Sequence, residues 1–503
     1  MLSLKSSYFP DAWKFANVIA LYKKGSKSSP GNYRPVSLLS IISKLLETLV
    51  SDVLKIHLSD KLNPRQFGFR PKHTSLDLLL NMTQRWTNTL HKQGEVRAVA
   101  LDMSKAFDKV WHKGLLLKLR SFGIDGALLA WIESFLSNRQ QRVLVGNSYS
   151  DLLPVLAGVP QGSVLGPILF LCFIDDIFNC VTNDLNVFAD DSTLSRIIAS
   201  PAHRAAAAAS LNTDLLALQA WASLWLVKFN DDKTELVTFS RKADVAAFRS
   251  GKPVDPSARR RGRPRKLNSR SLESKSELKV TTPTAPLNPH PPLVFCGVTL
   301  QEATSFKIVG LTITHNLSWT EHVARTAKNA NRAVALLKRS SAVLDGPALA
   351  TVYKSHVRSR MEYCCPIWMA AGKAALGRLD RVDARARRII GLKHSLPLPS
   401  LSHRRWVAGL CVFHRLLHGY CPEAIADLRP ASLLAPPART SRRTRGASAS
   451  LQLAHPARAP DYWARSFVPR FTKAFNALPA HVQAEPSPQK FKVLTNSINH
   501  SFD

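Results

Sequence analysis

The sequence predicts an α+β fold in which acidic side chains gather at one edge of a sheet. Asp190 and Asp191 are adjacent, and apolar and β-prone residues flank them on both sides, a pattern typical of two strands joined by a tight turn. A second short strand, 99–102, also ends in a carboxylate, that of Asp102. Helical segments alternate with these strands, which favours layers of helix and sheet with one functional edge.

The adjacent aspartates have two interpretations. Neighbouring carboxylates repel each other, so a buried turn that carries two of them usually has a cation beside it. Proteins that hold a divalent ion through carboxylates and a substrate phosphate are typically nucleotidyl transferases. Taken alone, such a pair is more often an ordinary exposed turn, and the rest of the chain has to decide between the two.

Charge and composition indicate a polyanionic partner. The 503 residues include 69 Lys and Arg against 35 Asp and Glu, a net charge of +34, and 45% of them are hydrophobic, enough for a large core. The partner is either nucleic acid or an acidic membrane face. The positive excess is spread along the chain, which favours a long basic channel over a tethering arm, and nucleic acid is the preferred partner. The seven cysteines lack zinc-binding spacing, and neither a signal peptide nor a membrane-spanning run is visible. We expect a soluble intracellular protein with no membrane partner.

The first 95 residues are expected to form a helical lobe with basic connections. Residues 38–58 place apolar side chains at helical spacing, with Lys44, Glu47 and Lys55 off the stripe. A loop at 66–70 leads to a second helix. The elements expected from there to residue 240 are a helix at about 76–90, the strand 99–102, a helix from about 113, a Gly- and Pro-rich loop at 158–163 that starts an apolar helix, the aspartate hairpin, a helix at 211–225, and a turn at 230–233 into a strand at 234–239.

Beyond residue 240, segments with the composition of ordered protein alternate with segments whose composition is typical of disorder. Residues 241–292 are rich in Arg, Lys, Ser and Pro and are expected to be a disordered basic insert. Residues 429–460 have the composition of a linker, and 461–503 of a short ordered tail. The remaining elements expected are a strand at 306–311 and helices at 319–344, 347–361, 376–390 and 404–417.

Asp102 and the aspartate pair together suggest a two-metal site. In such a site one ion activates an attacking 3′-hydroxyl while the other holds a triphosphate. Phe107 follows Asp102 closely, and a bulky ring at that place would lie under the sugar of an incoming nucleotide and clash with a 2′-hydroxyl. This arrangement favours synthesis of DNA over synthesis of RNA.

The motifs, in their order, resemble those of the reverse transcriptases of non-LTR (LINE-like) retrotransposons, of jockey-type elements in particular. The resemblance covers nearly the whole chain and extends to Arg404-Arg405 and Ser466-Phe467. The matching segments are 32–37 and 66–70 for the two fingers motifs, 100–112 for motif A, 158–167 for motif B, 188–191 for motif C, 230–234 for motif D and 309–311 for motif E, although the family more often has Tyr-Leu-Gly at the last position.

This resemblance implies a right-hand polymerase with fingers and palm over residues 12–310, a helical thumb over 311–395 and a basic C-terminal region over 396–503. The implied enzyme is an RNA-directed DNA polymerase that uses an RNA template, a DNA primer, dNTPs and two Mg²⁺ ions. The implied location is the nucleus, with a cytoplasmic ribonucleoprotein stage.

The resemblance also implies roles for individual residues. Asp102, Asp190 and Asp191 would bind the metal ions, and Lys233 would protonate the leaving pyrophosphate. The other residues of the expected site are Phe107 as the sugar filter, Gln161 and Gly162 as contacts to template and nucleotide, and Arg34 and Arg70 as contacts to triphosphate or template backbone, for which a plain basic surface is an equal alternative.

Other acidic and basic positions are interpreted more plainly. Asp175 and Asp176 are expected to cap or flank an apolar helix, Asp108 to orient a turn, and the 16 histidines to be structural because they form no cluster. In the insert, Arg261 and Arg263 belong to a sequence that resembles an AT-hook, which enters a narrow A·T minor groove. A solvated charge run or nuclear-import signal is the more common meaning of such a sequence.

Two other functions stay open at this point. A catalytically silent relic would still bind nucleic acid through its charge, and an RNA-dependent RNA polymerase is disfavoured by Phe107 and by Ala189, where those enzymes usually have Gly. Full-length members of the family carry an N-terminal endonuclease, and this chain starts just before the fingers motifs. We therefore expect a truncated copy or partial gene product that relies on an endonuclease in cis or in trans.

Overall fold

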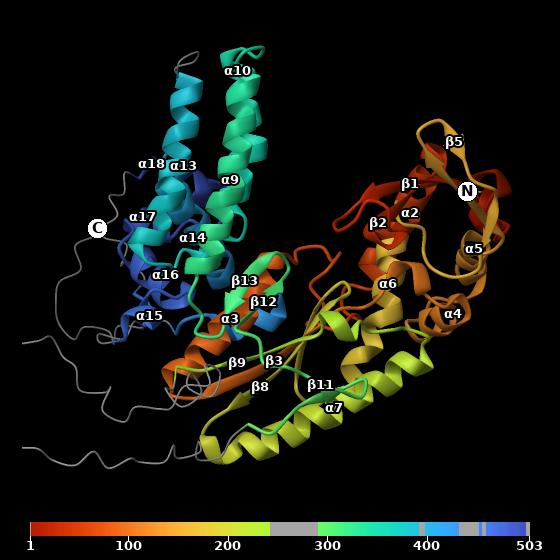
Figure 1. Ribbon diagram of the computed structural model, residues 1–503, viewed down its shortest axis with the longest axis horizontal. Helices are drawn as coiled ribbons and strands as arrows, with labels where there is room; N and C mark the ends of the chain where they lie inside the picture. Colours follow the sequence, from red (N-terminus) through yellow and green to blue (C-terminus); the bar gives the residue numbers. More distant parts are fainter. Residues whose placement is uncertain (1, 242–289, 392–397, 432–451, 455–458, 499–503) are drawn as a thin grey trace, which may run out of the picture.

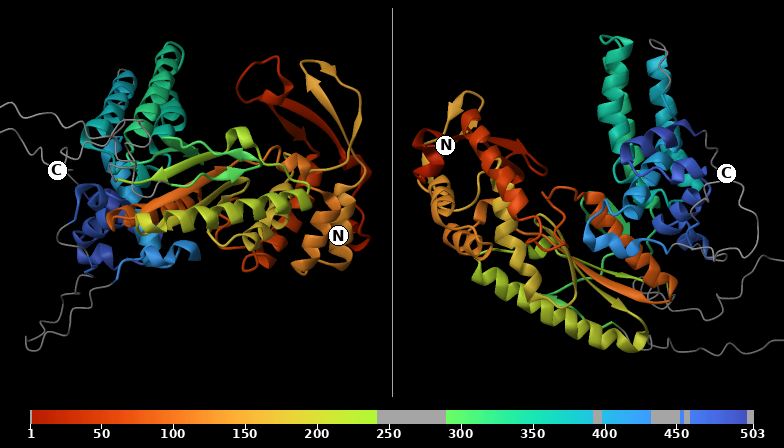
Figure 2. Two further views of the ribbon diagram at one scale, coloured as in Figure 1. Left: turned by 60° about the horizontal axis from the view of Figure 1, so that its bottom comes forward. Right: turned by 180° about the vertical axis from the view of Figure 1, so that it is seen from behind.

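The computed structural model describes residues 2–241, 290–391, 398–431, 452–454 and 459–498. Residues 242–289 of the predicted insert at 241–292, with Arg261 and Arg263, and most of the predicted linker at 429–460 lie outside the described residues. Within the described part, helices pack on sheets, as the predicted α+β class requires. A lobe that combines helices with a sheet and a second lobe that is mainly helical lie at opposite ends of a central sheet (Figure 1, Figure 2).

The central sheet, here called the palm sheet, has four antiparallel strands. They are, in order across the sheet, β7 (Asp184–Phe188), β8 (Asp191–Ile198), β3 (Glu95–Leu101) and β9 (Glu235–Phe239). Helix α3 (Ser75–His91) packs on the face that carries Val96 and Ala98. Residues Val99 and Leu101 belong to the core on the other side, with α6 (Gly166–Ile174) and α7 (Arg204–Leu224). Because both faces are covered, five of the seven residues of β3 are apolar, and the two charged ones, Glu95 and Arg97, are themselves buried.

One lobe, here called the fingers, is built on a five-stranded sheet. The predicted helical lobe is therefore wrong in part: β1 pairs antiparallel with β2 and parallel with β4, which is far along the chain, and local patterns do not show such a pairing. The strands are β1 (Phe15–Tyr22), β2 (Tyr33–Leu38), β4 (Arg139–Val145), β5 (Ser148–Tyr149) and β6 (Leu153–Val155), and the helices are α1 (Leu2–Lys5), α2 (Ile41–His57), α4 (His112–Ser121) and α5 (Gly126–Leu136).

Helix α2 forms where the apolar spacing predicts it, but it is rotated relative to that pattern. Ile41, Leu45 and Leu49 are 78, 65 and 66% exposed, whereas the Glu47 side chain is fully buried. The Glu47 carboxylate accepts hydrogen bonds from the backbone N–H groups of Val164 and Leu165, at 2.7 and 3.2 Å. These N–H groups precede α6 and have no partner within that helix, so the carboxylate caps it and turns Glu47 inward.

The second lobe begins with a hairpin and continues as the helical thumb. The predicted single strand at 306–311 is wrong, because the chain turns at Val309 and Gly310, both of which have positive φ. The elements are β12 (Ser305–Ile308), β13 (Leu311–Thr314), α9 (Thr320–Ser340), α10 (Gly346–Val352), a π-helical turn at Tyr353–Arg358, α11 (Ser359–Glu362), α12 (Cys365–Trp368) and α13 (Lys373–Gly391). In Figure 1, α9 and α13 stand side by side and project from the rest of the molecule. A small hairpin, β10 (Val294–Phe295) and β11 (Val298–Thr299), lies before this lobe.

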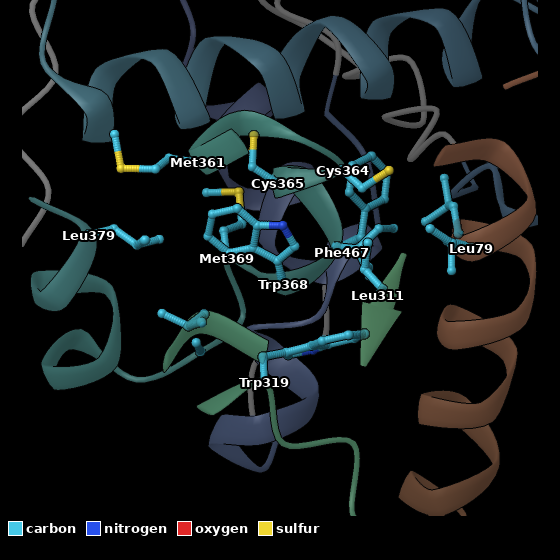
Figure 3. Close-up of a cluster of buried hydrophobic side chains, with 14 of the residues drawn as sticks. Leu79, Leu311, Trp319, Met361, Cys364, Cys365, Trp368, Met369, Leu379 and Phe467 are labelled. Atoms are coloured by element: carbon cyan, nitrogen blue, oxygen red, sulfur yellow. The ribbon is translucent and has the colours of Figure 1, made fainter. Parts of the chain in front are cut away.

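The C-terminal helices share a core with the thumb and with α3. Figure 3 shows this cluster, with Trp319 and Trp368 of the thumb near Leu79 of α3 and Phe467 of the C-terminal part. A Cβ added to Gly409 of α14 would lie only 1.8 Å from Cζ of Phe471 in α16, so the contact requires glycine. The C-terminal helices are α14 (Leu401–Leu417), α15 (Asp461–Ala464), α16 (Phe467–Asn476), α17 (Ala480–Gln483) and α18 (Pro488–Ser497). None of the described helices is both long enough and apolar enough to cross a membrane.

A buried ion pair ties the palm sheet to α7. The Arg204 guanidinium donates from Nε and Nη2 to the two carboxylate oxygens of Glu95, at 3.0 and 2.6 Å, and both side chains are almost fully buried. His290 Nε2 lies 3.0 Å from the same carboxylate. Burial would raise the pKa of Glu95, but the hydrogen bonds from His290 and Arg204 outweigh burial and hold this pKa well below its usual range.

We expect Arg204→Met to destabilise the fold by about 3–5 kcal/mol, because it leaves a buried carboxylate without its main partner. Arg325→Met is the control, since Arg325 forms an exposed i,i+4 pair on α9 and should matter by less than about 1 kcal/mol. Folding lowers the pKa of Glu95, so the stabilisation is present above the usual glutamate pKa and is lost as the pH falls below it. Thermal unfolding measures both effects, and equal shifts for the two variants would contradict the special role of the buried pair.

Candidate active site

The register of the palm sheet brings the three predicted metal-binding carboxylates to one place. Strand β3 pairs with β8 so that Leu101 lies opposite Ser192, which sets Asp102 beside Asp191 at the same edge of the sheet. Strands β7 and β8 pair up to Phe188 and Asp191, so Asp190 lies in the tight turn between them. Two segments about ninety residues apart in sequence thus place their carboxylates at one end of the sheet.

This edge opens into a cavity of about 1580 Å³ between the fingers and the palm sheet. Asp102 and Asp190 line it. The residues that line the cavity and carry positive charge are Lys23, Lys27, Arg34, Lys105, Lys109, Lys228 and Lys233. An acidic centre surrounded by basic side chains suits a nucleic acid or a triphosphate. The basic side chains can bind the phosphates, and the carboxylates can bind a cation that accompanies them.

The carboxylates repel each other, as a cation site requires. Burial and the nearby charge of Asp102 raise the pKa of Asp190. Protein atoms that displace water from the Asp191 carboxylate, and then repulsion from Asp190 and Asp102, raise the pKa of Asp191 to about 6, although the residue is exposed at the rim. A bound cation would relieve this repulsion.

The donor set fits a hard divalent ion, since it consists of carboxylate oxygens. Within the described ranges, no three Asp, Glu, His or Cys side chains already surround a common point. One reason is visible at Asp102, whose Oδ2 is 2.6 Å from the Lys233 ammonium. The Asn230 N–H donates to the Asp102 carbonyl at 2.8 Å, which fixes the turn of Lys233 against the end of β3. The ammonium therefore occupies one side of a carboxylate that we expect to bind metal.

Gln66, which the sequence analysis did not single out, supports the catalytic turn. Its side chain is fully buried, and its Oε1 accepts the N–H groups of Ala189 and Gly68, both at 2.9 Å. Ala189 has φ +58°, a left-handed conformation that is costly for a residue with a Cβ atom. The carboxamide thus holds the backbone in the turn that carries Asp190. The local sequence signal for this role is an amide two residues before a glycine in the fingers motif.

Gly68 is required by the same contact. A Cβ atom added to it would lie 2.4 Å from the Ala189 backbone nitrogen. The chain beside it forms a short parallel pairing with β7, in which Phe67 donates its N–H to the Val187 carbonyl at 2.8 Å. The segment 65–68 therefore acts as a further strand that presses on the catalytic hairpin.

The motif B loop is also held by named contacts. Gln161 Nε2 donates to Asp108 at 2.8 Å, so Asp108 orients this side chain, and Asp108 does not itself face the other carboxylates as a partner. Gly162 has φ +126°, and a Cβ atom there would lie 2.5 Å from the Ser37 carbonyl oxygen. Ser37 in turn donates its N–H to the Gln161 carbonyl at 2.7 Å. Gln161 and Gly162 both line the cavity, in the position expected for substrate contact.

Two other predicted site residues separate in the structure. Arg34 lines the cavity, and its charge acts to lower the pKa of Asp190. Arg70 does not reach the cavity: its guanidinium donates to the carbonyls of Asn63 and Ser59, at 2.6 and 3.0 Å. In the structure Arg70 therefore fixes the loop, and its expected contact to triphosphate or template stays a prediction.

The second acidic pair is structural, as expected. Asp175 accepts the N–H of Asn63 at 2.9 Å, and Asp176 accepts from the Lys118 ammonium and the Trp221 indole, at 2.6 and 2.9 Å. Asp175 thus fixes the loop at Asn63 and Asp176 joins α4 to α7, and neither carboxylate lines the cavity. Phe107 does line the cavity, and the Phe170 ring of α6 stacks on it with centroids 4.5 Å apart.

A family model described as reverse transcriptase (RNA-dependent DNA polymerase) matches residues 22–313, a span that contains all three carboxylates. The chain belongs to the reverse transcriptase family. Its fingers, palm and thumb are thus those of a right-hand polymerase, as the motif order predicts.

Two relatives of this reverse transcriptase come from mobile elements of Drosophila melanogaster. The probable RNA-directed DNA polymerase from transposon BS is 30% identical over 403 residues, 77% of this chain and 39% of the relative. The RNA-directed DNA polymerase from mobile element jockey is 34% identical over 250 residues, 48% of this chain and 27% of the relative. The matches confirm the predicted jockey-type resemblance, and the chain spans at most 39% of the length of these two relatives. Apo telomerase from Candida tropicalis aligns with a TM-score of 0.40 and 11% identity, over 80% of this chain and 62% of that chain.

We expect Gln66→Met to slow nucleotide addition by about tenfold to a hundredfold, because it keeps the side-chain volume but leaves two buried N–H groups without their acceptor. The Mg²⁺ concentration that gives half-maximal rate should rise as well, since the turn that carries Asp190 is no longer held. Gln489→Met, an exposed substitution on α18, is the matched control. Metal titrations of single-nucleotide addition measure both quantities, and an unchanged Mg²⁺ dependence in Gln66→Met would refute the assignment.

Proposed function

We propose that this chain is the polymerase part of a non-LTR retrotransposon protein, and that it extends a DNA 3′-hydroxyl by copying an RNA template. The observation that supports the proposal is the β3–β8 register, by which Asp102 lies beside the Asp190-Asp191 turn at an edge of the sheet where Asp102 and Asp190 line a basic cavity. A family relationship without this geometry would fit a degenerate copy equally well. Here the local chain is also built to hold the turn, through Gln66 and Gly68.

The three carboxylates would hold two divalent ions, for which we propose Mg²⁺ because all the donors are carboxylate oxygens. When bound, these ions supply activation of the 3′-hydroxyl and neutralise charge on the phosphates. Lys23 and Arg34 of the fingers also line the cavity, and we assign them to binding of the triphosphate. Lys233 carries a proton 2.6 Å from Asp102, so it can donate that proton to a leaving pyrophosphate bound beside the same carboxylate.

Sugar selection is assigned to Phe107. Its ring lines the cavity five residues after Asp102, and Phe170 supports it from below. An aromatic ring in that place leaves no room for a 2′-hydroxyl, which supports DNA rather than RNA as the product. Ala189 adopts a left-handed backbone conformation that glycine would accept without strain. In this chain the residue is alanine, and the hydrogen bond from its N–H to Gln66 holds the conformation.

The proposed partners follow from this activity and from the mobile-element relatives. They are an RNA template, a DNA primer and dNTPs, with an endonuclease in cis or in trans that supplies the primer end. We propose a nuclear location, with a cytoplasmic ribonucleoprotein stage, because the expected primer is chromosomal DNA. The alternative, a silent relic that only binds nucleic acid, shares the charge of the chain but gives no reason for a preserved carboxylate geometry.

We expect Asp190→Asn to reduce primer extension on poly(rA)/oligo(dT) to background, because the amide can neither carry the charge nor bridge metal ions. Binding of the same primer-template, measured by fluorescence anisotropy, should stay within about twofold, since the basic residues of the cavity are unchanged. A wild-type chain that binds this duplex but gives no extension with Mg²⁺ or Mn²⁺ would support the relic instead.

We expect Phe107→Ala to admit ribonucleotides. The ratio of kcat/KM for dTTP to that for UTP on the same template should fall by about tenfold or more, because the substitution removes the ring that excludes the 2′-hydroxyl. Steady-state single-nucleotide addition gives both values. Unchanged sugar selection would show that another residue acts as the filter.

A further inference from the structure

Phe69 belongs to the fingers motif at 66–70, and burial in a hydrophobic core does not explain why an aromatic residue stands at this position. Half of its surface, 50%, is exposed, and it lines the cavity next to the catalytic carboxylates. Its backbone has φ +53°, a left-handed conformation that residues with a Cβ atom rarely adopt. Strained, half-exposed residues of this kind gather at functional sites.

Two anchors, one on each side, impose this conformation. On one side, Gly68 rests on the backbone of Ala189 in the catalytic turn. On the other side, the Arg70 guanidinium donates to the carbonyls of Asn63 and Ser59. The contacts of its neighbours therefore fix the backbone of Phe69 at the cavity. Its side chain is not needed as an anchor and is available for contacts within the cavity.

The ring of Phe69 contacts the ring of Phe107. Their centroids are 5.9 Å apart at an interplanar angle of 85°, an edge-to-face pair. Phe170, which is 2% exposed, stacks on Phe107 at 4.5 Å and 18°. Phe107 is thus supported by one ring along its face and by a second at an edge, and these two contacts together fix the orientation of the ring.

A filter that excludes a single oxygen atom depends on this orientation. The terminal torsion of a Phe side chain has a broad energy well, so a ring held on one side only can tilt by tens of degrees. A tilt of that size opens space for a 2′-hydroxyl without moving the backbone. The edge contact from Phe69 removes this freedom.

We propose that Phe69 is a specificity-determining residue: it holds Phe107 in the orientation that rejects ribonucleoside triphosphates. The proposal rests on the function proposed above and assigns the sugar filter to a pair of rings from two different motifs, one in the fingers and one in the palm. Phe69 acts through Phe107, so it is a positioning residue for the filter rather than a catalytic residue.

The test compares Phe69→Leu with two reference variants on poly(rA)/oligo(dT). We expect Phe69→Leu to lower the dTTP-to-UTP ratio of kcat/KM about 3- to 10-fold, the range expected for one edge-to-face contact. Addition of dTTP should stay within about twofold. Phe69→Tyr keeps the ring and should keep the ratio, whereas Tyr149→Leu removes an aromatic of similar exposure, 52%, from a fingers position outside the cavity lining and should also keep it.

A double-substitution cycle separates this proposal from the function on which it rests. If Phe69 acts through Phe107, then Phe69→Leu combined with Phe107→Ala gives the ratio of Phe107→Ala alone. If Phe107→Ala lowers the dTTP-to-UTP ratio of kcat/KM but Phe69→Leu leaves it unchanged, the inference about Phe69 is overturned, while Phe107 remains the sugar filter. Multiplicative effects of the two substitutions overturn it as well, because Phe69 would then act independently.

Two further outcomes complete the test. If neither substitution changes the ratio, the sugar filter itself is misassigned. If Phe69→Leu and Phe69→Tyr both lose as much dTTP addition as UTP addition, then Phe69 serves substrate binding in general. This outcome would also overturn the inference.

Discussion

The antiparallel register of β3 against β8 is the constraint on which the site depends. It sets Leu101 opposite Ser192 and so places Asp102 beside Asp191 at one end of the palm sheet. The side-chain period of a strand is two, so a slip by one residue would turn the carboxylate of Asp102 toward the opposite face. The apolar residues of β3 are buried against helices on both faces, which makes such a slip costly. Packing of the palm sheet thereby fixes the geometry of its acidic edge.

The fingers add a second constraint, because their contacts to the palm are made by backbone and by buried polar groups. Gln66 holds the Ala189 turn through its carboxamide, and Glu47 caps the helix that follows the motif B loop. Gly162 allows that loop to touch the backbone of β2 at a distance that no Cβ atom permits. Each contact joins two motifs that are distant in sequence, so the motifs are parts of one scaffold and not separate ligand sites.

Sequence reasoning succeeded where function requires a particular residue type and failed where distant partners decide. Asp102, Asp190 and Asp191 could be predicted as a group, since charge repulsion and strand patterns are local signals. The inward rotation of Glu47 could not, because its partners are N–H groups of a helix start more than a hundred residues later. Arg70 shows the converse: a basic residue in a recognised motif turned out to donate to nearby carbonyls, and charge alone did not reveal which neighbours it would find.

Two residues with left-handed backbone conformations at this site, Ala189 and Phe69, lie in adjoining segments that contact each other. Ala189 has φ +58° and depends on Gln66, while Phe69 has φ +53° and sits between Gly68, which presses on Ala189, and the anchored Arg70. Loosening one segment would therefore release the other. The turn that carries Asp190 and the part of the cavity wall that carries Phe69 therefore share contacts through Gly68 and Ala189. If the proposed function holds, the same few contacts would position the metal ligands and influence the choice of sugar.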